Sequence, residues 1–124
     1  SDVPPETLPE PDPEPEVEVN FVNTDHETYI YNIANTETLE VEMTVTGERC
    51  WVQVKKDNNQ GDDIEGKMYY KDEVQLWETD HSLWIRLGAP STVSITINGY
   101  TIEEIDSASP VNLQLNLVQY QVEG

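Results

Sequence analysis

The chain has 124 residues, enough for one domain but not comfortably for two, and carries a formal net charge of −19 from 25 acidic and 6 basic residues. This charge argues against nucleic acid as a partner, because phosphate binding needs clustered lysine and arginine, and against electrostatic docking on anionic lipid. No apolar run approaches the roughly eighteen residues of a membrane span, and the single cysteine excludes an internal disulfide.

Residues 1–16 predict an acidic, proline-rich linker. Six of the eight prolines lie there. Proline removes amide donors and favours polyproline II, while the intervening carboxylates repel one another, so the segment should be extended and bury no core. We therefore expect one domain over residues 17–124. Because the first residues are acidic and proline-rich rather than a signal peptide, we expect the chain to be a piece of a longer protein.

A first pair of strands is predicted after the linker. Residues 17–22 alternate apolar with polar side chains, residues 23–26 form a turn, and residues 27–33 form the partner strand. An isoleucine lies between two tyrosines in the second strand, so alternation leaves its buried face open.

Residues 39–56 predict a second hairpin, with Gly47 and Glu48 suited to a type II′ turn. This turn would place Cys50 in the core and bring Glu40 opposite Lys55, an opposite-charge pair that supports the register. The apolar pairs would be Val45 with Cys50, Met43 with Val52, and Val41 with Val54.

The middle of the chain predicts a loop over residues 57–63 and short strands over 64–70, 74–79 and 83–87. In the second of these strands, Val74 and Leu76 are opposed to Trp77.

The acidic loop carries side-chain oxygens that calcium could use, but the spacing of an EF-hand fails and a solvated turn is favoured. The sequence therefore predicts no metal and no cofactor. The oxygen-bearing loop residues considered are Asp57, Asn59, Asp62 and Asp63.

The clearest hairpin lies over residues 92–105, where Asn98 and Gly99 tolerate the positive φ angles of a type I′ turn. A last strand is predicted over residues 111–118. The turn predicts the pairs Ile97 with Tyr100, Thr96 with Thr101, Ile95 with Ile102, and Val93 with Glu104.

Together the patterns predict an all-β fold of about seven to nine short strands with no helix. Such strands, with turn signals every eight to twelve residues or so, are typical of an antiparallel β-sandwich or a partly closed barrel.

Four aromatic residues are the candidate binding site. Trp51, Trp77 and Trp84 fall on the polar side of their strands and, with Tyr69, could form a platform for sugar or peptide. The alternative is that a second layer covers them. A covered position is favoured for Trp51, because large aromatic side chains are usually well buried, and both positions remain open for Trp77 and Trp84.

We expect no catalytic activity. An inward-facing Cys50 disfavours a thiolate nucleophile, and Asp80, His81 and Ser82 are too close in sequence to adopt triad geometry. His26 and His81 both fall in turns and are expected to be exposed and without a role.

Three segments resemble the extracytoplasmic C-terminal domain of the RodZ family of bacterial cell-shape proteins. They are residues 50–54 (CWVQV), 83–89 (LWIRLGA) and 93–99 (VSITING), and their order and spacing carry the resemblance over about residues 39–117. The acidic leader is similar to the family's variable linker. The chain departs from the family in a longer, more acidic loop at 57–63 and in the strands over 17–33, which suggest a Gram-positive type with an added hairpin.

The resemblance implies an extracytoplasmic domain that is tethered to the cell membrane by an upstream segment. It implies a non-catalytic role in cell-wall elongation, in which a sheet face or edge contacts other membrane proteins of the elongation machinery. The alternative is a module that binds cell-wall polymer or carbohydrate through exposed tryptophans.

Overall fold

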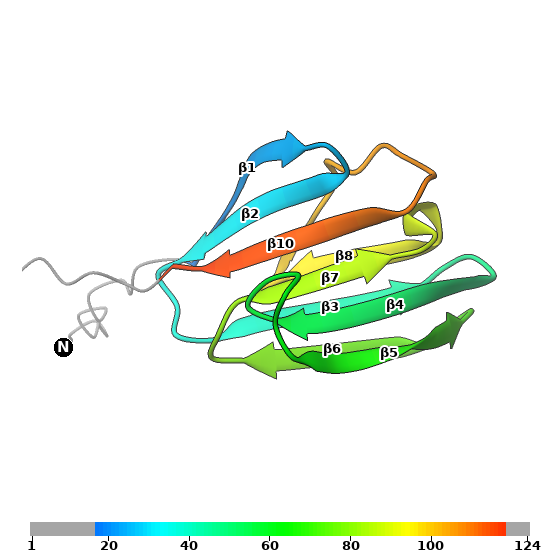
Figure 1. The fold of residues 1–124 in the computed structure, drawn as a ribbon, viewed down its shortest axis with the longest axis horizontal. Coiled ribbons are helices and arrows are strands. Elements are labelled where there is room, and N and C mark those ends of the chain that lie inside the picture. The colour runs from blue at the N-terminus through cyan, green and yellow to red at the C-terminus, as the bar shows by residue number, and fades with distance from the viewer. Residues whose placement is uncertain (1–16, 119–124) are drawn as a thin grey trace, which may run out of the picture.

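The computed structural model describes residues 17–118, and within this range the chain forms a sandwich of two β-sheets. Figure 1 shows the two layers lying face to face. The all-β sandwich prediction is confirmed, and the alternative of a partly closed barrel is not realised. The predicted linker, residues 1–16, lies outside the described residues. Within the described range no helix is long and apolar enough to cross a membrane.

The larger sheet has six strands in the order β1-β2-β10-β7-β4-β5 and the smaller has four in the order β6-β3-β8-β9. A single 3₁₀ turn, η1 (Pro90–Thr92), precedes β8. The strands are β1 (Glu18–Asp25), β2 (Thr28–Ala34), β3 (Leu39–Val45), β4 (Arg49–Lys56), β5 (Asp63–Tyr70), β6 (Val74–Thr79), β7 (Leu83–Leu87), β8 (Val93–Ile97), β9 (Tyr100–Thr101) and β10 (Val111–Leu117).

The core lies between the two sheets and is made by every second residue of the strands. Successive side chains on a strand point to opposite faces, so alternating apolar residues bring one apolar face of each sheet inward. Cys50 is buried, as predicted. The largest fully buried side chains are those of Tyr31, Ile33, Leu39, Val41, Met43, Val45, Leu83, Ile85, Leu87, Ile97, Leu113 and Leu115.

The predicted β8–β9 hairpin forms with the expected turn. Asn98 and Gly99 have φ angles of 47° and 89°, as a type I′ turn requires. Ile97 pairs with Tyr100 and Thr96 with Thr101. Beyond the strand, the Ile102 amide still donates to the Ile95 carbonyl at 3.0 Å.

The predicted pairing of Val93 with Glu104 is wrong. β9 ends at Thr101, and the β8–β9 register stops at the pair Thr96–Thr101. Glu104 turns inward to accept hydrogen bonds from two tyrosines, which are described below.

The predicted hairpin over residues 39–56 is also wrong. β3 pairs with β6 and β8, whereas β4 pairs with β5 and β7, so the two strands belong to different sheets. The amides of Thr46 and Gly47 both donate to the Thr92 carbonyl, at 2.8 and 3.0 Å, and this contact takes the chain from one sheet to the other. Glu40 consequently lies opposite Glu78, and Lys55 pairs with Asp63.

The predicted β1–β2 hairpin forms, with its turn slightly later in the chain, because β1 continues to Asp25. The structure also decides the buried face of β2, which the sequence left open. Tyr29, Tyr31 and Ile33 face the core, and Ile30 faces outward.

One strand pair departs from the predicted antiparallel arrangement. β10 is parallel to β2 and antiparallel to β7, and Figure 1 shows it lying between them. The last strand of the described range therefore joins the β1–β2 hairpin to the rest of the six-stranded sheet.

Candidate functional site

The four predicted platform residues do not share a surface. Tyr69 and Trp77 are core residues, only 2% and 6% exposed, and their rings meet edge to face with centroids 6.4 Å apart. Trp84 is 8% exposed, whereas Trp51 is 44% exposed. The predicted platform is therefore wrong, and so is the covered position favoured for Trp51.

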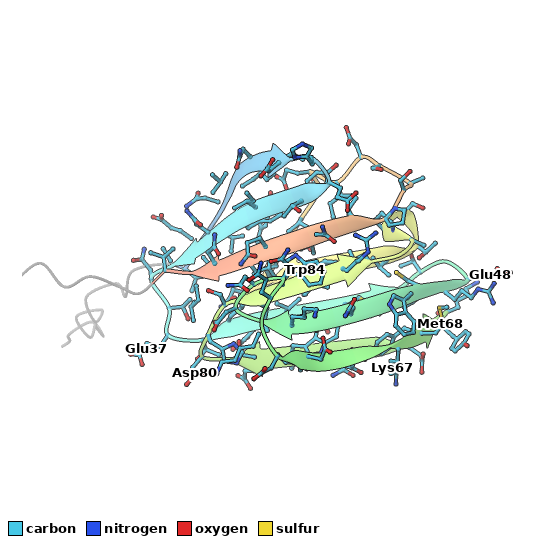
Figure 2. All side chains as sticks on the ribbon, viewed as in Figure 1. Glu37, Glu48, Lys67, Met68, Asp80 and Trp84 are labelled. Carbon is cyan, nitrogen blue, oxygen red and sulfur yellow. The ribbon has the colours of Figure 1, made fainter. Side chains whose placement is uncertain are left out.

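Trp84 lies on the outer face of β7 (Figure 2), beside Gln114 of β10 and Lys55 of β4. The Asp57 amide donates to the Ser82 carbonyl at 2.8 Å, and Gln114 Nε2 donates to the Asp57 carbonyl at 2.7 Å. Because β7 separates β10 from β4, the second contact reaches across β7. The long acidic loop thus begins by folding over the sheet beside Trp84.

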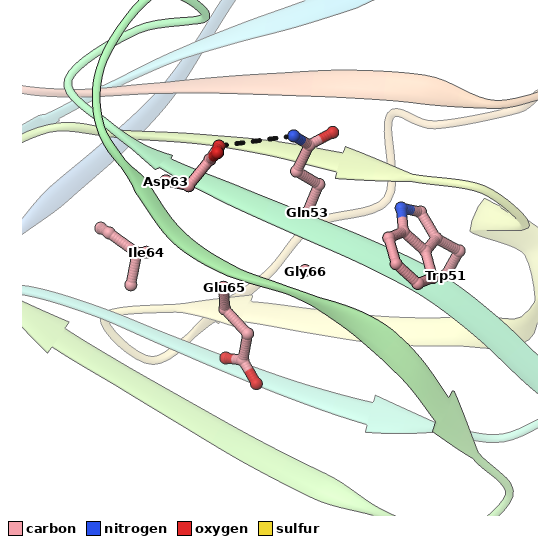
Figure 3. Close-up of a pocket in the computed structure, with 6 residues that line it drawn as sticks. All are labelled: Trp51, Gln53, Asp63, Ile64, Glu65 and Gly66. Carbon is pink, nitrogen blue, oxygen red and sulfur yellow. Dashed lines mark hydrogen bonds between the residues drawn. The ribbon is translucent and has the colours of Figure 1, made fainter.

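Trp51 borders a groove on the outer face of β4 and β5, shown in Figure 3. A Cβ atom on Gly66 would lie 3.7 Å from Trp51 Cζ2, so the indole ring lies beside this glycine. The polar groups nearby bind one another. Gln53 Nε2 donates to Asp63 Oδ1 at 3.5 Å, and Lys55 Nζ lies 3.1 Å from the same oxygen. The hydrogen bond and charge of Lys55 hold the pKa of Asp63 below its usual value.

The loop considered for calcium does not gather a ligand set. Across the part of the chain that the structure describes, no cluster of three or more His, Cys, Asp or Glu side chains could hold a metal ion. His26 contacts Asp25, and His81 contacts the Ser82 carbonyl, so the structure keeps the two histidines in separate turns.

Two carboxylates, which sequence reasoning did not single out, join the sheets along their sides. Glu104, beyond β9, accepts hydrogen bonds from the hydroxyls of Tyr31 in β2 and Tyr100 in β9, at 2.8 and 2.9 Å. On the opposite side, Glu65 of β5 accepts from Trp77 Nε1 of β6 at 3.0 Å and from the Tyr69 hydroxyl. Both contacts link residues of different sheets, a relation that no local sequence pattern reveals.

The Glu104 contact predicts a pH-dependent contribution to stability. Burial raises the pKa of Glu104, but hydrogen bonds from Tyr31, Tyr100 and nearby amides outweigh it and leave the pKa below its ordinary 4.5. A carboxyl group whose pKa is lower in the folded state stabilises the fold when the pH is above its unfolded-state pKa. This stabilisation is lost as the pH falls through the folded-state pKa. Glu104→Gln should therefore cost about 1–3 kcal/mol at neutral pH, and less as the pH falls below about 4.5.

Urea unfolding of both chains between pH 3 and pH 7, with about half a unit between points, measures this difference. Glu103→Gln is the matched control, since the hydrogen bonds of the tyrosine hydroxyls go to its neighbour. A cost for Glu104→Gln that stays constant across the range would contradict the prediction.

Tyr31 and Tyr69 predict a loss of stability at high pH. Burial, together with the hydrogen bonds to Glu104 and Glu65, raises both pKa values well above the ordinary 10.0. A group whose pKa is higher in the folded state contributes its full stabilisation when the pH is below its unfolded-state pKa. This stabilisation is lost as the pH rises toward the folded-state pKa. In a spectroscopic titration, these two tyrosines should ionise only as the chain unfolds. Ionisation of all six tyrosines before any loss of the β-sheet signal would contradict this.

The structure decides which face of β6 is buried, a choice that the sequence left open for Trp77. Val74 and Leu76 are 55% and 56% exposed, while Trp77 between the sheets fills the core position. The strand therefore turns its two aliphatic side chains to solvent.

The basic residues are distributed unevenly between the two sheets. The four-stranded sheet carries no lysine or arginine, because the basic residues lie on the β7-β4-β5 side of the other sheet and on the turn after β5. The basic residues are Arg49, Lys55, Lys56, Lys67, Lys71 and Arg86.

These features define a two-layer β-sandwich domain whose candidate sites are sheet faces and strand edges. Residues 42–112 match the model of the RodZ C-terminal domain, and the chain belongs to this family. Membership connects the chain with bacterial cell shape. The match begins inside β3, ends at the start of β10 and excludes β1 and β2. No curated protein and no solved structure matches the chain.

Proposed function

We propose that this chain is a non-catalytic interaction domain of a RodZ-like cell-shape protein. It acts outside the cytoplasmic membrane, to which an upstream segment tethers it, and contacts other membrane proteins of the wall-elongation machinery. The family match over residues 42–112 supports this proposal. The β1–β2 hairpin ahead of the matched region fits a Gram-positive type of the domain.

The observation that carries the proposal is where this domain exposes apolar side chains. Four of the eight large hydrophobic residues that are more than 40% exposed in the described range lie on β5 and β6, the strands that end the two sheets on the same side. Exposed apolar groups at strand edges suit contact with another protein, which can supply main-chain partners and cover them. These residues are Ile64 and Tyr70 on β5 and Val74 and Leu76 on β6.

A second candidate function is binding of cell-wall polymer, which the exposure of Trp51 favours. Its ring lies beside Gly66 on an open sheet face, and a sugar ring could stack on it. With Tyr69 and Trp77 in the core and Trp84 covered, Trp51 would have to act without the other three aromatic residues.

Two binding assays with the purified full chain separate these functions. We expect the immobilised chain to retain elongation proteins from detergent-solubilised membranes, and to stay in the supernatant when peptidoglycan is sedimented. Sedimentation with peptidoglycan that is lost in Trp51→Ala, without retention of membrane proteins, would replace the first function by the second.

A further inference from the structure

Four strands end the two sheets, and three of them carry features that discourage pairing with another chain. β1 has a register shift between Phe21 and Asn23, and β5 has one opposite Val54 and Lys55 and also carries Lys67. β9 has only two residues. Bulges, edge lysines and very short strands are the usual protections of sheet edges.

β6 has none of these protections. It keeps an unbroken register with β3 over six residues, from the pair Leu39–Thr79 to the pair Thr44–Val74. It contains no proline, lysine or arginine. In Figure 1 it forms the border of its sheet, on the side of β3 away from β8. Among the described edge strands, β6 is therefore the one that combines an unbroken six-residue register with no lysine or proline.

On the side away from β3, the backbone of β6 has N–H and C=O groups that bond to no neighbouring strand of the described range. The Asn98 amide donates to the Glu40 carbonyl at 2.8 Å, so the backbone of Glu40 faces β8. In an antiparallel sheet, the backbone N–H and C=O groups of alternate residues point to opposite neighbouring strands. The backbone of Val41, next to Glu40, therefore points to β6 and bonds to Trp77. By the same alternation, the N–H and C=O groups of Leu76 and Glu78 point away from β3, to the open side of β6.

A side-chain contact agrees with this orientation. Gln75 Nε2 donates to the Leu76 carbonyl at 3.1 Å, a local contact that an incoming strand could replace.

The side chains beside this edge are aliphatic and acidic. Val74 and Leu76 are the two most exposed large hydrophobic residues in the described range. Glu78 lies directly opposite Glu40 on β3, in the closer, non-hydrogen-bonded type of pair, and like charges so placed are destabilising. The four-stranded sheet has no basic residue, so a lysine or arginine beside Glu78 would come from a partner.

We propose that the open edge of β6 binds an extended segment of a partner protein as a fifth strand of the four-stranded sheet. The segment places aliphatic side chains beside Val74 and Leu76 and a lysine or arginine beside Glu78. This inference rests on the proposed function and names its contact surface and the chemistry of the partner. A second copy that pairs through its own β6 fits less well, since that strand contains no lysine or arginine to place beside Glu78 and the copy carries the same net charge of −19.

A designed peptide tests the edge directly. Acetyl-Thr-Lys-Thr-Val-Thr-Val-Thr-amide, paired antiparallel, sets lysine beside Glu78 and valines beside Leu76 and Val74. The matched peptide has glutamate in place of lysine. Titration of the isotope-labelled full chain should shift the β6 amide resonances, and hydrogen exchange should slow at the amides of Leu76 and Glu78. The amides of Gln75 and Trp77, already bonded to β3, should change little.

Three variants complete the test. Leu76→Lys should weaken binding of the lysine peptide by about tenfold or more, and Glu78→Lys should reverse the preference between the two peptides. Val22→Lys, at a 50% exposed position of β1, is the control and should change binding less than about twofold. Far-ultraviolet circular dichroism checks that every variant keeps the fold.

Several results would overturn the inference. They are equal binding of the two peptides, slowed exchange on β1 or β5 instead of β6, or no binding up to a few millimolar peptide. Loss of a dimer in Leu76→Lys, seen by light scattering, would assign the edge to a second copy. If Leu76→Lys still retains membrane proteins, this inference fails and the proposed function stands. If the wild type retains none but binds the peptide at β6, the proposed function fails instead.

Discussion

Shortening the chain to residues 36–124 is expected to abolish its cooperative unfolding. The deletion removes β2, whose Tyr31 and Ile33 are fully buried, and leaves β10 as an apolar sheet edge. Loss of a large core side chain costs about 2–5 kcal/mol, so losing several approaches the roughly 5–15 kcal/mol that stabilises a whole domain. The Glu104 carboxylate also loses its hydrogen bond from Tyr31.

Circular dichroism and urea unfolding compare this chain with residues 17–124, which keep the hairpin and should unfold in one transition. The prediction matters because the family match begins at residue 42, inside β3. A shortened chain that unfolds cooperatively, with a midpoint close to that of residues 17–124, would show that the hairpin is only an addition to the family's fold.

Replacing Trp77 by alanine is expected to destabilise the domain by about 3–5 kcal/mol. Its side chain fills the core between β6 and the other sheet, contacts the Tyr69 ring, and donates to Glu65. The alanine variant leaves a cavity and a carboxylate without its indole donor. Trp77→Phe should recover part of the loss, since the phenyl ring restores packing but not the hydrogen bond.

Trp51→Ala is the matched control for this prediction. Because Trp51 is 44% exposed, its loss should cost about 1 kcal/mol, near the middle of the range for substitutions. Chemical unfolding of the three variants measures the differences. An equal cost for Trp51→Ala and Trp77→Ala would contradict the assignment of Trp77 to the core and Trp51 to the surface.

Alternation and turn chemistry by themselves determined much of the fold. The period of two in strands such as β3 and β10 is a local property, and it predicted both the all-β class and the inward faces of these two strands. Asn98 and Gly99 predicted their hairpin correctly, because a two-residue type I′ turn sets the register of its own strands. Three short segments also sufficed to indicate the family.

Tertiary structure alone decided which strands are neighbours. Gly47 and Glu48 suited a hairpin turn, yet the chain changes sheets there, because Thr46 and Gly47 bond to the distant Thr92. Local pattern also fails to show the buried face of an edge strand such as β6, which has apolar residues on both faces. Trp77 could fill the core only with Val74 and Leu76 in solvent, and that choice depends on the opposite sheet. Local pattern shows that a strand has two faces, but long-range packing determines which face is buried and which edge stays open.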